Sequence, residues 1–362
     1  MKRLIFLFDG TWNSAATGRF VDITNIFRMN LAISRSATPD IPQITFYAPG
    51  PGNRGVFDKE MGGLFGQGLD QIIREAYVNL SSNYEDHDEI LIFGYSRGSI
   101  AARALTCLIA ESGLLKPQQL HRLASVWNRF IDINSGKISS EHPSEVHSHV
   151  HRNVRIKFVG LFDSVLGRGH KSPNRFSQLV FKNNTVSPIV DRGVHILSID
   201  DNKKIFKPMI WGARESKQKI EQIWMPGVHS DIGGYGVPNL IGISSLLTMI
   251  SKVKSTGVAF NQHFLDAMIR KIEEVNNMEI RSEREDIFGK ILRSACRTPG
   301  DSQHLEKKHP LLDAIYNKKF IVKRRRRAYN HKYLSPFLEL EPEKNEYTDL
   351  IINSVEAAIA RT

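Results

Sequence analysis

One pentapeptide in the chain has the spacing of a catalytic turn. Gly94-Tyr95-Ser96-Arg97-Gly98 fits G-x-S-x-G, in which a serine lies on a strained turn between a strand and a helix. Glycines flank such a serine because the strand and helix approach so closely that a Cβ atom would collide. EILIFGY before the serine is typical of a buried strand, and GSIAARALTCLIA after it of a helix. The pattern predicts a nucleophilic Ser96; the alternative is a tight turn with an incidental serine.

A histidine further along the chain could supply the base that this serine needs. His229 lies in IWMPGVHSDIGGYG, directly after an apolar run typical of a strand. A serine nucleophile is activated by an imidazole within hydrogen-bond reach, which a carboxylate orients in turn. The surrounding glycines indicate a backbone bent to place a side chain. We therefore predict that His229 is the base of Ser96, rather than a structural histidine.

Two aspartates compete for the role of the acid. Asp163 ends VRIKFVGLFD and Asp200 ends VHILSID, so both lie where a predicted parallel strand ends and where ligands bind in open α/β sheets. The usual hydrolase acid follows the second strand after the nucleophile, which favours Asp200, whereas placement after the first strand favours Asp163. GLFDSVLG resembles a shaped active-site loop more than SIDDNKK does, so we choose Asp163. Asp231 is a third candidate and is expected to anchor its own loop.

The end of the first apolar run could complete such a site. Counting strands backward from Ser96, LIFLF takes the place of the strand whose following loop supplies half of an oxyanion hole. The backbone N–H groups of Gly10 and Thr11, together with that of Arg97, are the expected donors. The alternative is that Asp9 and Thr11 only cap a turn, although a capped turn would also aim these N–H groups.

Alternating apolar and helical segments must position these residues. Runs typical of strands buried on both faces are Leu4–Phe8, Gln43–Tyr47, Glu89–Tyr95, Val154–Phe162, Val194–Ile199 and Glu221–Met225. Helices are expected at Leu69–Leu80, from Ser96 to about Ile109, and at Leu240–Ile250, Ala259–Val275 and Glu346–Ile359. The alternation predicts an α/β-hydrolase-like fold, with a mostly parallel sheet and helices on both faces.

The character of the chain changes near residue 240. We expect a catalytic core over residues 1–240 and a mainly helical, basic C-terminal region over residues 241–362, which acts as a lid or appendage. This region contains Lys323–Arg327, KRRRR, the densest charge run in the chain. The run could contact phosphates of lipid or nucleic acid, although a solvated surface is the simpler interpretation.

The composition is that of a globular protein with a substantial core. Of the 362 residues, 41% are hydrophobic and 24% charged, and the net charge of +11 favours acidic partners. Cys107 and Cys296 are spaced for neither zinc nor a disulfide framework, and no metal or cofactor is expected. No apolar run approaches the roughly 20 residues needed to cross a bilayer. We interpret the N-terminus as a strand rather than a signal peptide, and expect a cytoplasmic protein that could act at a membrane surface.

Two further patterns are not expected to carry chemistry. Gly62–Gly68 is rich in glycine but lacks the spacing and the lysine of a phosphate-binding loop. It is interpreted as a loop that leads into the predicted helix at Leu69 and could line the substrate pocket beside Ser96. His147, His149 and His151 would share one face of a strand and could then bind a metal, but their polar surroundings favour a solvated loop.

Seven segments, in order along the chain, resemble one protein family. They are FLFDGTWN, TNIFR, YAPGPG, GYSRGSIAAR, VGLFDSV, SIDDNKKIFKPMIW and MPGVHSDIGGYG. The chain resembles the uncharacterised α/β-hydrolase family that includes the type VI secretion phospholipase effectors. The resemblance implies a triad of Ser96, Asp163 or Asp200, and His229, with phospholipase or related esterase activity. The SIDD segment departs from the acidic–basic pattern usual in that family.

Two functions are therefore weighed. The first is a serine hydrolase, a lipase, phospholipase or carboxylesterase, that cleaves a lipid or ester substrate through an acyl-enzyme. The alternative is a catalytically idle or regulatory module that binds anionic lipid or nucleic acid through the basic C-terminal region, with nucleic acid the less favoured partner. The presence of both Ser96 and His229 favours the enzyme.

Overall fold

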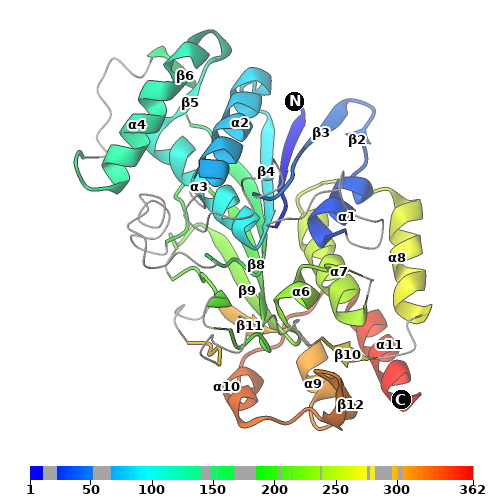
Figure 1. Cartoon of the computed structure of the whole chain (residues 1–362). Coiled ribbons are helices and arrows are strands. Elements are labelled where there is room, and N and C mark those ends of the chain that lie inside the picture. Colours follow the sequence, from blue (N-terminus) through cyan, green and yellow to red (C-terminus); the bar gives the residue numbers. More distant parts are fainter. Residues whose placement is uncertain are drawn as a thin grey trace, which may run out of the picture.

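The molecule is organised around an eight-stranded sheet (Figure 1). The computed structural model describes residues 1–10, 23–51, 67–139, 148–151, 153–166, 185–203, 206–212, 214–236, 239–274, 278–281, 296–300 and 305–361. The strand order is β11-β9-β8-β7-β4-β1-β3-β2, and only the β2·β3 pair is antiparallel. The strands are β1 (Arg3–Phe8), β2 (Ser36–Thr38), β3 (Ile41–Ala48), β4 (Glu89–Tyr95), β7 (Ile156–Phe162), β8 (Arg192–Ser198), β9 (Lys219–Met225) and β11 (Glu306–Lys308).

Helices cover both faces of this sheet (Figure 1). One face packs against α2 (Gln67–Asn83), α3 (Arg97–Ser112) and α4 (Leu123–Asn134), and the other against α1 (Asn25–Ala32), α7 (Leu240–Lys254), α8 (Gln262–Glu274) and α11 (Thr348–Ala360). Successive side chains of a strand point to opposite faces. Along β1, accordingly, Leu4 and Phe6 belong to one hydrophobic cluster, and Ile5 and Leu7 to the other. Burial on both sides explains why this strand is apolar throughout.

The predicted fold class is confirmed. The six apolar runs correspond to β1, β3, β4, β7, β8 and β9, and the five predicted helices to α2, α3, α7, α8 and α11. Four strands of the structure were not predicted from the sequence: β2, β11, β5 (Leu114–Leu115) and β6 (Val150–His151). Each has only two or three residues, which is too short for an alternation of apolar and polar residues to show in the sequence.

The C-terminal region contains strands as well as helices. It adds α9 (Leu311–Ile315), α10 (Ser335–Leu338) and a small sheet of β10 (Glu279–Ile280), β12 (Lys319–Val322) and β13 (Arg325–Ala328). Two 3-10 helices (Pro117–Arg122 and Lys332–Leu334) and α6 (His229–Ile232) complete the described elements. One hydrophobic cluster contains Leu91 of the main sheet, Leu246 of α7 and Phe320 of β12. Residues before and after position 240 therefore share one hydrophobic core. The division of the chain into a catalytic core and a C-terminal region at that position stays a prediction.

No described helix combines the length and the apolar character needed to cross a membrane.

Candidate active site

The turn between β4 and α3 has the strained backbone of a nucleophile elbow. Ser96 has φ 58° and ψ −124°, a conformation that residues with a side chain rarely adopt. Its N–H donates to Phe162 O at 3.0 Å, and its carbonyl accepts from Ser99 N at 3.2 Å. Arg97 is the first residue of α3, where the helix dipole favours negative charge. The strain thus falls on the residue that the motif singles out.

Both glycines of the motif are required by close backbone approach. A Cβ atom on Gly94 would lie 2.6 Å from Gly98 O, and one on Gly98 would lie 2.3 Å from Phe8 O. Real Cβ atoms do not approach other atoms so closely, and moving backbone to relieve the clash would disturb the packing of the sheet. The second contact also shows that the end of β1 packs directly on the turn that carries Ser96.

The structure brings Ser96, His229 and Asp163 together at the carboxyl edge of the sheet. His229 Nε2 lies 2.9 Å from Ser96 Oγ, and His229 Nδ1 lies 2.6 Å from Asp163 Oδ2. Ser96 follows β4, Asp163 follows β7 and His229 follows β9, and because these strands are parallel their carboxyl ends lie at the same edge of the sheet. With the proton on Nδ1, donated to Asp163, Nε2 can accept the hydroxyl proton of Ser96.

Two aromatic rings hold the imidazole of His229 between them. The rings of Tyr95 and Phe206 each lie 4.9 Å from it, at interplanar angles of 28° and 18°. The Tyr95 hydroxyl also donates to His229 O at 3.2 Å. These contacts fix the plane of the imidazole, so its two nitrogens stay aimed at the serine and the aspartate.

Asp163 is fully buried and remains charged because a cation faces it. Arg297 Nη1 donates to Oδ1 at 2.6 Å and Nη2 to Oδ2 at 3.0 Å, while Ser198 N donates to Oδ1 at 3.0 Å. Burial alone would raise the pKa of Asp163, but Arg297 and His229 hold that pKa well below its usual range. Arg297 was not predicted from the sequence, because it lies in SACRTPG, outside every motif considered.

The other two candidate acids lie in different hydrogen-bond networks. The Asp200 carboxylate accepts from Gly227 N at 2.7 Å, Tyr329 Oη at 2.8 Å and Tyr333 Oη at 2.9 Å. Asp200 thus ties the C-terminal region to the sheet, and burial raises its pKa. Asp231 accepts from Val228 N at 3.1 Å and from an Asn239 amide at 2.8 Å, so it holds its own loop.

The predicted oxyanion donors are placed in part. Thr11 lies outside the described residues, and the N–H of Gly10 donates to Asp9 Oδ1 at 2.7 Å. The Asp9 carboxylate also accepts hydrogen bonds from Thr24 Oγ1 at 2.8 Å and Tyr47 Oη at 2.7 Å. Burial raises the pKa of Asp9 to about 6, although these hydrogen bonds favour the charged form and oppose the rise. The carboxylate of Asp9 therefore caps the end of β1, and the assignment of Gly10 and Thr11 as oxyanion donors stays a prediction.

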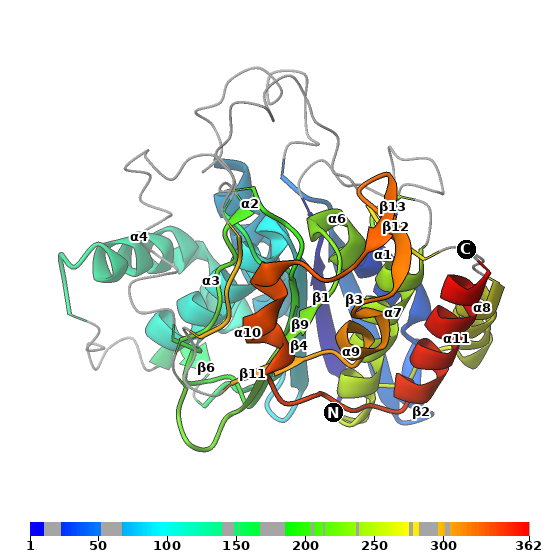
Figure 2. The same cartoon turned by 90° about the horizontal axis from the view of Figure 1, so that it is seen from below.

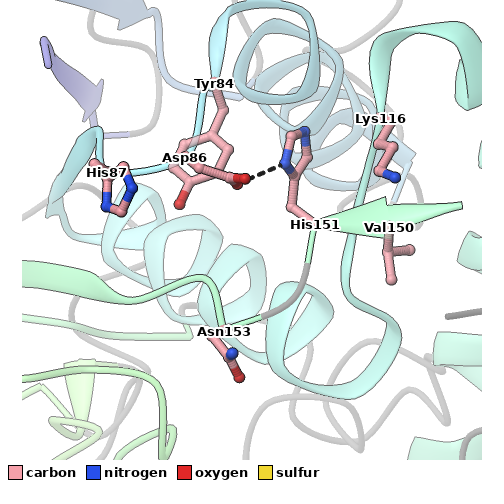
Figure 3. Close-up of a pocket in the computed structure, with 7 residues that line it drawn as sticks. All are labelled: Tyr84, Asp86, His87, Lys116, Val150, His151 and Asn153. Carbon is pink, nitrogen blue, oxygen red and sulfur yellow. Dashed lines mark hydrogen bonds and ion pairs between the residues drawn. The ribbon is translucent and has the colours of Figure 1, made fainter. Parts of the chain in front are cut away.

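Of the other patterns, only parts fall within the described residues. His151 lines a pocket of about 490 Å³, where its Nδ1 lies 3.1 Å from Asp86 Oδ1 (Figure 3). This pocket adjoins the start of β4, the opposite end from Ser96. His147 and most of the stretch Gly62–Gly68 lie outside the description. Among the described residues, no group of three or more His, Cys, Asp or Glu could hold a metal ion.

The architecture and this edge of the sheet define the class of the protein. A mostly parallel sheet with helices on both faces, and a serine on a strained strand-to-helix turn, make an α/β-hydrolase-like fold. The chain belongs to the family of Tle1-like phospholipase effectors of the type VI secretion system, because the model of that family's catalytic domain matches residues 2–252. The family resemblance seen in the sequence is thereby confirmed. Membership supports lipase or phospholipase activity.

The chain is also similar to other known proteins, among them the following three. The uncharacterized protein YEL023C of Saccharomyces cerevisiae is 29% identical over 230 residues, which are 58% of this chain and 32% of that protein. A structure of the Tle1 effector bound to the VgrG spike has a TM-score of 0.38 at 17% identity, covering 66% of this chain and 52% of that one. An uncharacterized Pseudomonas aeruginosa protein has a TM-score of 0.43 at 16% identity, covering 72% and 47%. The chain thus spans about a third of the yeast protein and about half of each solved chain.

Proposed function

We propose that the chain is a serine hydrolase that cleaves carboxylic esters of phospholipids through Ser96, His229 and Asp163. The observation that carries this proposal is the continuous hydrogen-bonded path from Ser96 Oγ through the imidazole to Asp163, at 2.9 and 2.6 Å. Family membership supports a lipid substrate. The serine mechanism rests on the geometry of the site.

The proposed reaction passes through an acyl-enzyme. Ser96 Oγ attacks the ester carbonyl while His229 Nε2 takes the hydroxyl proton, and Asp163 stabilises the imidazolium. The imidazolium then protonates the leaving alcohol, and a water molecule, deprotonated by His229, releases the fatty acid. The N–H of Arg97 at the start of α3 is the proposed first donor to the oxyanion, and that of Thr11 the second, because the N–H of Gly10 already donates to Asp9 Oδ1.

A covalent probe and lipid vesicles together test this proposal. A fluorophosphonate should form one adduct, and mass spectrometry of peptides should place it on Ser96 because only an activated serine reacts. Vesicles of phosphatidylcholine and phosphatidylglycerol should release fatty acid and lysophospholipid when the protein is added. An adduct elsewhere would contradict the mechanism. Cleavage of p-nitrophenyl butyrate without fatty-acid release from vesicles would contradict the substrate class.

A basic hairpin beside the site favours an anionic membrane surface as the place of action. The run Lys323–Arg327 forms the turn and second strand of the β12–β13 hairpin, with Lys323 and Arg324 at φ 48° and 66° as in a tight two-residue turn. Arg324, Arg325 and Arg326 are exposed. The hairpin, drawn in orange in Figure 2, is joined through β10 to α6, the helix that begins at His229: Lys323 N donates to Ile280 O at 2.8 Å, and Arg281 N donates to Asp231 Oδ2 at 3.1 Å.

The hairpin is fixed to the edge of the sheet that carries the site. Lys323 Nζ donates to Asp200 O at 3.1 Å, and Tyr329, directly after β13, donates to the Asp200 carboxylate at 2.8 Å. Ser198, two residues before Asp200, donates its N–H to Asp163. We therefore propose that the exposed arginines hold the active site against anionic head groups.

Neutralising these arginines should weaken vesicle binding without changing the chemistry. The triple variant Arg324→Asn, Arg325→Ser and Arg326→Ser keeps an asparagine at the positive φ. Each basic residue near an anionic surface contributes about 1 kcal/mol of binding free energy. We therefore expect the affinity for phosphatidylglycerol vesicles, measured by co-sedimentation, to fall about 100-fold. Hydrolysis of p-nitrophenyl butyrate should be unchanged.

The matched control removes the same charge elsewhere. Lys116, Lys217 and Lys219 are exposed and lie away from the hairpin, and Lys219 begins β9 at the opposite edge of the sheet from Ser96. Their combined replacement by serine should leave most vesicle binding intact. Equal loss in both triple variants would mean that net charge, and not the hairpin, governs the contact.

A further inference from the structure

Arg297 makes a two-pronged contact with the carboxylate that faces His229. Its Nη1 lies 2.6 Å from Asp163 Oδ1 and its Nη2 lies 3.0 Å from Oδ2, and only 3% of its side chain is exposed. Guanidinium and carboxylate are planar groups of matching width, so a bidentate contact fixes both the position and the rotation of the carboxylate.

The guanidinium of Arg297 also donates to two backbone carbonyls, in segments that contact the site themselves. Nη1 donates to Ser198 O at 2.8 Å, and Nη2 donates to Phe206 O at 2.6 Å. Ser198 is the residue whose N–H donates to Asp163, and the ring of Phe206 stacks on His229. Arg297 therefore joins the carboxylate to the backbone of both neighbouring segments.

We infer that Arg297 is a positioning residue for the proposed reaction: it aims Asp163 at His229 and, by sharing the charge of that carboxylate, sets how strongly the carboxylate stabilises the imidazolium that forms during the reaction. This inference rests on the proposed function. A carboxylate without a cation beside it would stabilise the imidazolium more strongly. A permanent cation on the same carboxylate opposes that effect.

The other charged and titratable groups around Asp163 and His229 do not reverse the expected effect of Arg297. Asp201 Oδ2 accepts from His229 N at 3.4 Å, and Lys203 lies over the ring of Phe206. His195 faces Asp163 from β8, and burial lowers the pKa of His195 to about 3, so it is neutral in the working range. Since these groups are the same in wild type and in variants of Arg297, their effects cancel in a comparison.

The pH dependence of labelling and hydrolysis tests the inference. In Arg297→Gln, we expect the acid limb of kcat/KM for p-nitrophenyl butyrate, and of fluorophosphonate labelling, to move up by about one pH unit. We also expect kcat to fall about tenfold or more, because the carboxylate is no longer aimed. Arg297→Lys keeps the charge and loses the two-pronged contact, so it should lower kcat while its acid limb stays at the wild-type pH.

A matched arginine controls for general loss of stability. Arg3 is similarly buried and pairs with Glu89 at 2.7 Å, at the opposite edge of the sheet from Ser96. Arg3→Gln should lower the unfolding temperature and leave the acid limb in place.

Each outcome supports or overturns the inference. A wild-type pH profile in a folded Arg297→Gln protein would overturn it. If that variant does not fold, Arg297→Lys decides, and wild-type kcat in it would overturn the positioning role. If a fluorophosphonate did not label Ser96 in the wild-type protein, the proposed function itself would be refuted. That outcome is distinct from those that concern Arg297.

Discussion

Replacing Ser96 with alanine should lower kcat for ester hydrolysis by about a million-fold and abolish fluorophosphonate labelling. The variant lacks Ser96 Oγ, which lies 2.9 Å from His229 Nε2 and would form the acyl-enzyme. Binding and oxyanion contacts would still act on a bound water, so a small residual rate is expected. The measurement is hydrolysis of p-nitrophenyl butyrate together with release of fatty acid from phospholipid vesicles.

A second serine, in the first turn of α3, provides the control for this variant. Ser99 is fully buried, and its hydroxyl lies 3.4 Å from Phe162 O, which is a long hydrogen bond. Ser99→Ala should therefore retain most of the activity. If Ser96→Ala hydrolysed lipid esters at the wild-type rate, the hydrolase mechanism proposed for this chain would be wrong.

Replacing Asp163 with asparagine should lower kcat/KM by about 10,000-fold, because the imidazole would then hold its proton on the wrong nitrogen. An amide can donate to Nδ1, which leaves the proton on Nε2, where the base must be free. The amide also cannot neutralise the buried Arg297 beside it, so we expect a stability loss of about 3 kcal/mol or more. Initial rates and urea unfolding of the same preparation separate the two effects.

The change Asp200→Asn is the comparison that tests the choice between the two acids. Asp200 is 2% exposed and accepts from Tyr329 and Tyr333, so this variant should lose stability while the remaining folded protein keeps its activity. The opposite pattern, an active Asp163→Asn and an inactive Asp200→Asn, would make Asp200 the acid.

The pH dependence of folding follows from the lowered pKa of Asp163. A carboxyl group whose pKa is depressed on folding stabilises the native state above its unfolded pKa, and this contribution is lost as the pH falls through the folded value. Asp163→Asn should therefore remove part of the acid sensitivity of the wild-type protein.

The main sheet could be predicted because its strands are buried on both faces. Ile90 and Leu91, which point to opposite sides of β4, are both apolar, so each central strand stands out as a continuous run between helical segments. The hairpin β12–β13 could not be predicted this way, because its second strand begins with three arginines that read as a solvated charge run. The tertiary contacts of Tyr329 and Lys323 stabilise it instead.

The site could be predicted less completely than the sheet. The motif around Ser96 and the glycine-rich segment around His229 carry local signals, because their backbones must bend. Asp163 and Asp200 both end strands of the same sheet, and only the three-dimensional arrangement shows which one faces the imidazole. Arg297 pairs with Asp163 across 134 residues of sequence, with no local pattern at either position.

The family match ends at residue 252, yet two buried carboxylates at the edge of the sheet accept further hydrogen bonds from residues beyond it. Asp163 depends on Arg297, and Asp200 on Tyr329 and Tyr333. A relative that shares only the matched portion would keep the contacts from Ser198, His229 and Gly227 and lack those from Arg297 and the two tyrosines. Substitutions beyond residue 252 can therefore change the charge around Asp163, the proposed acid, without altering any segment within the matched range.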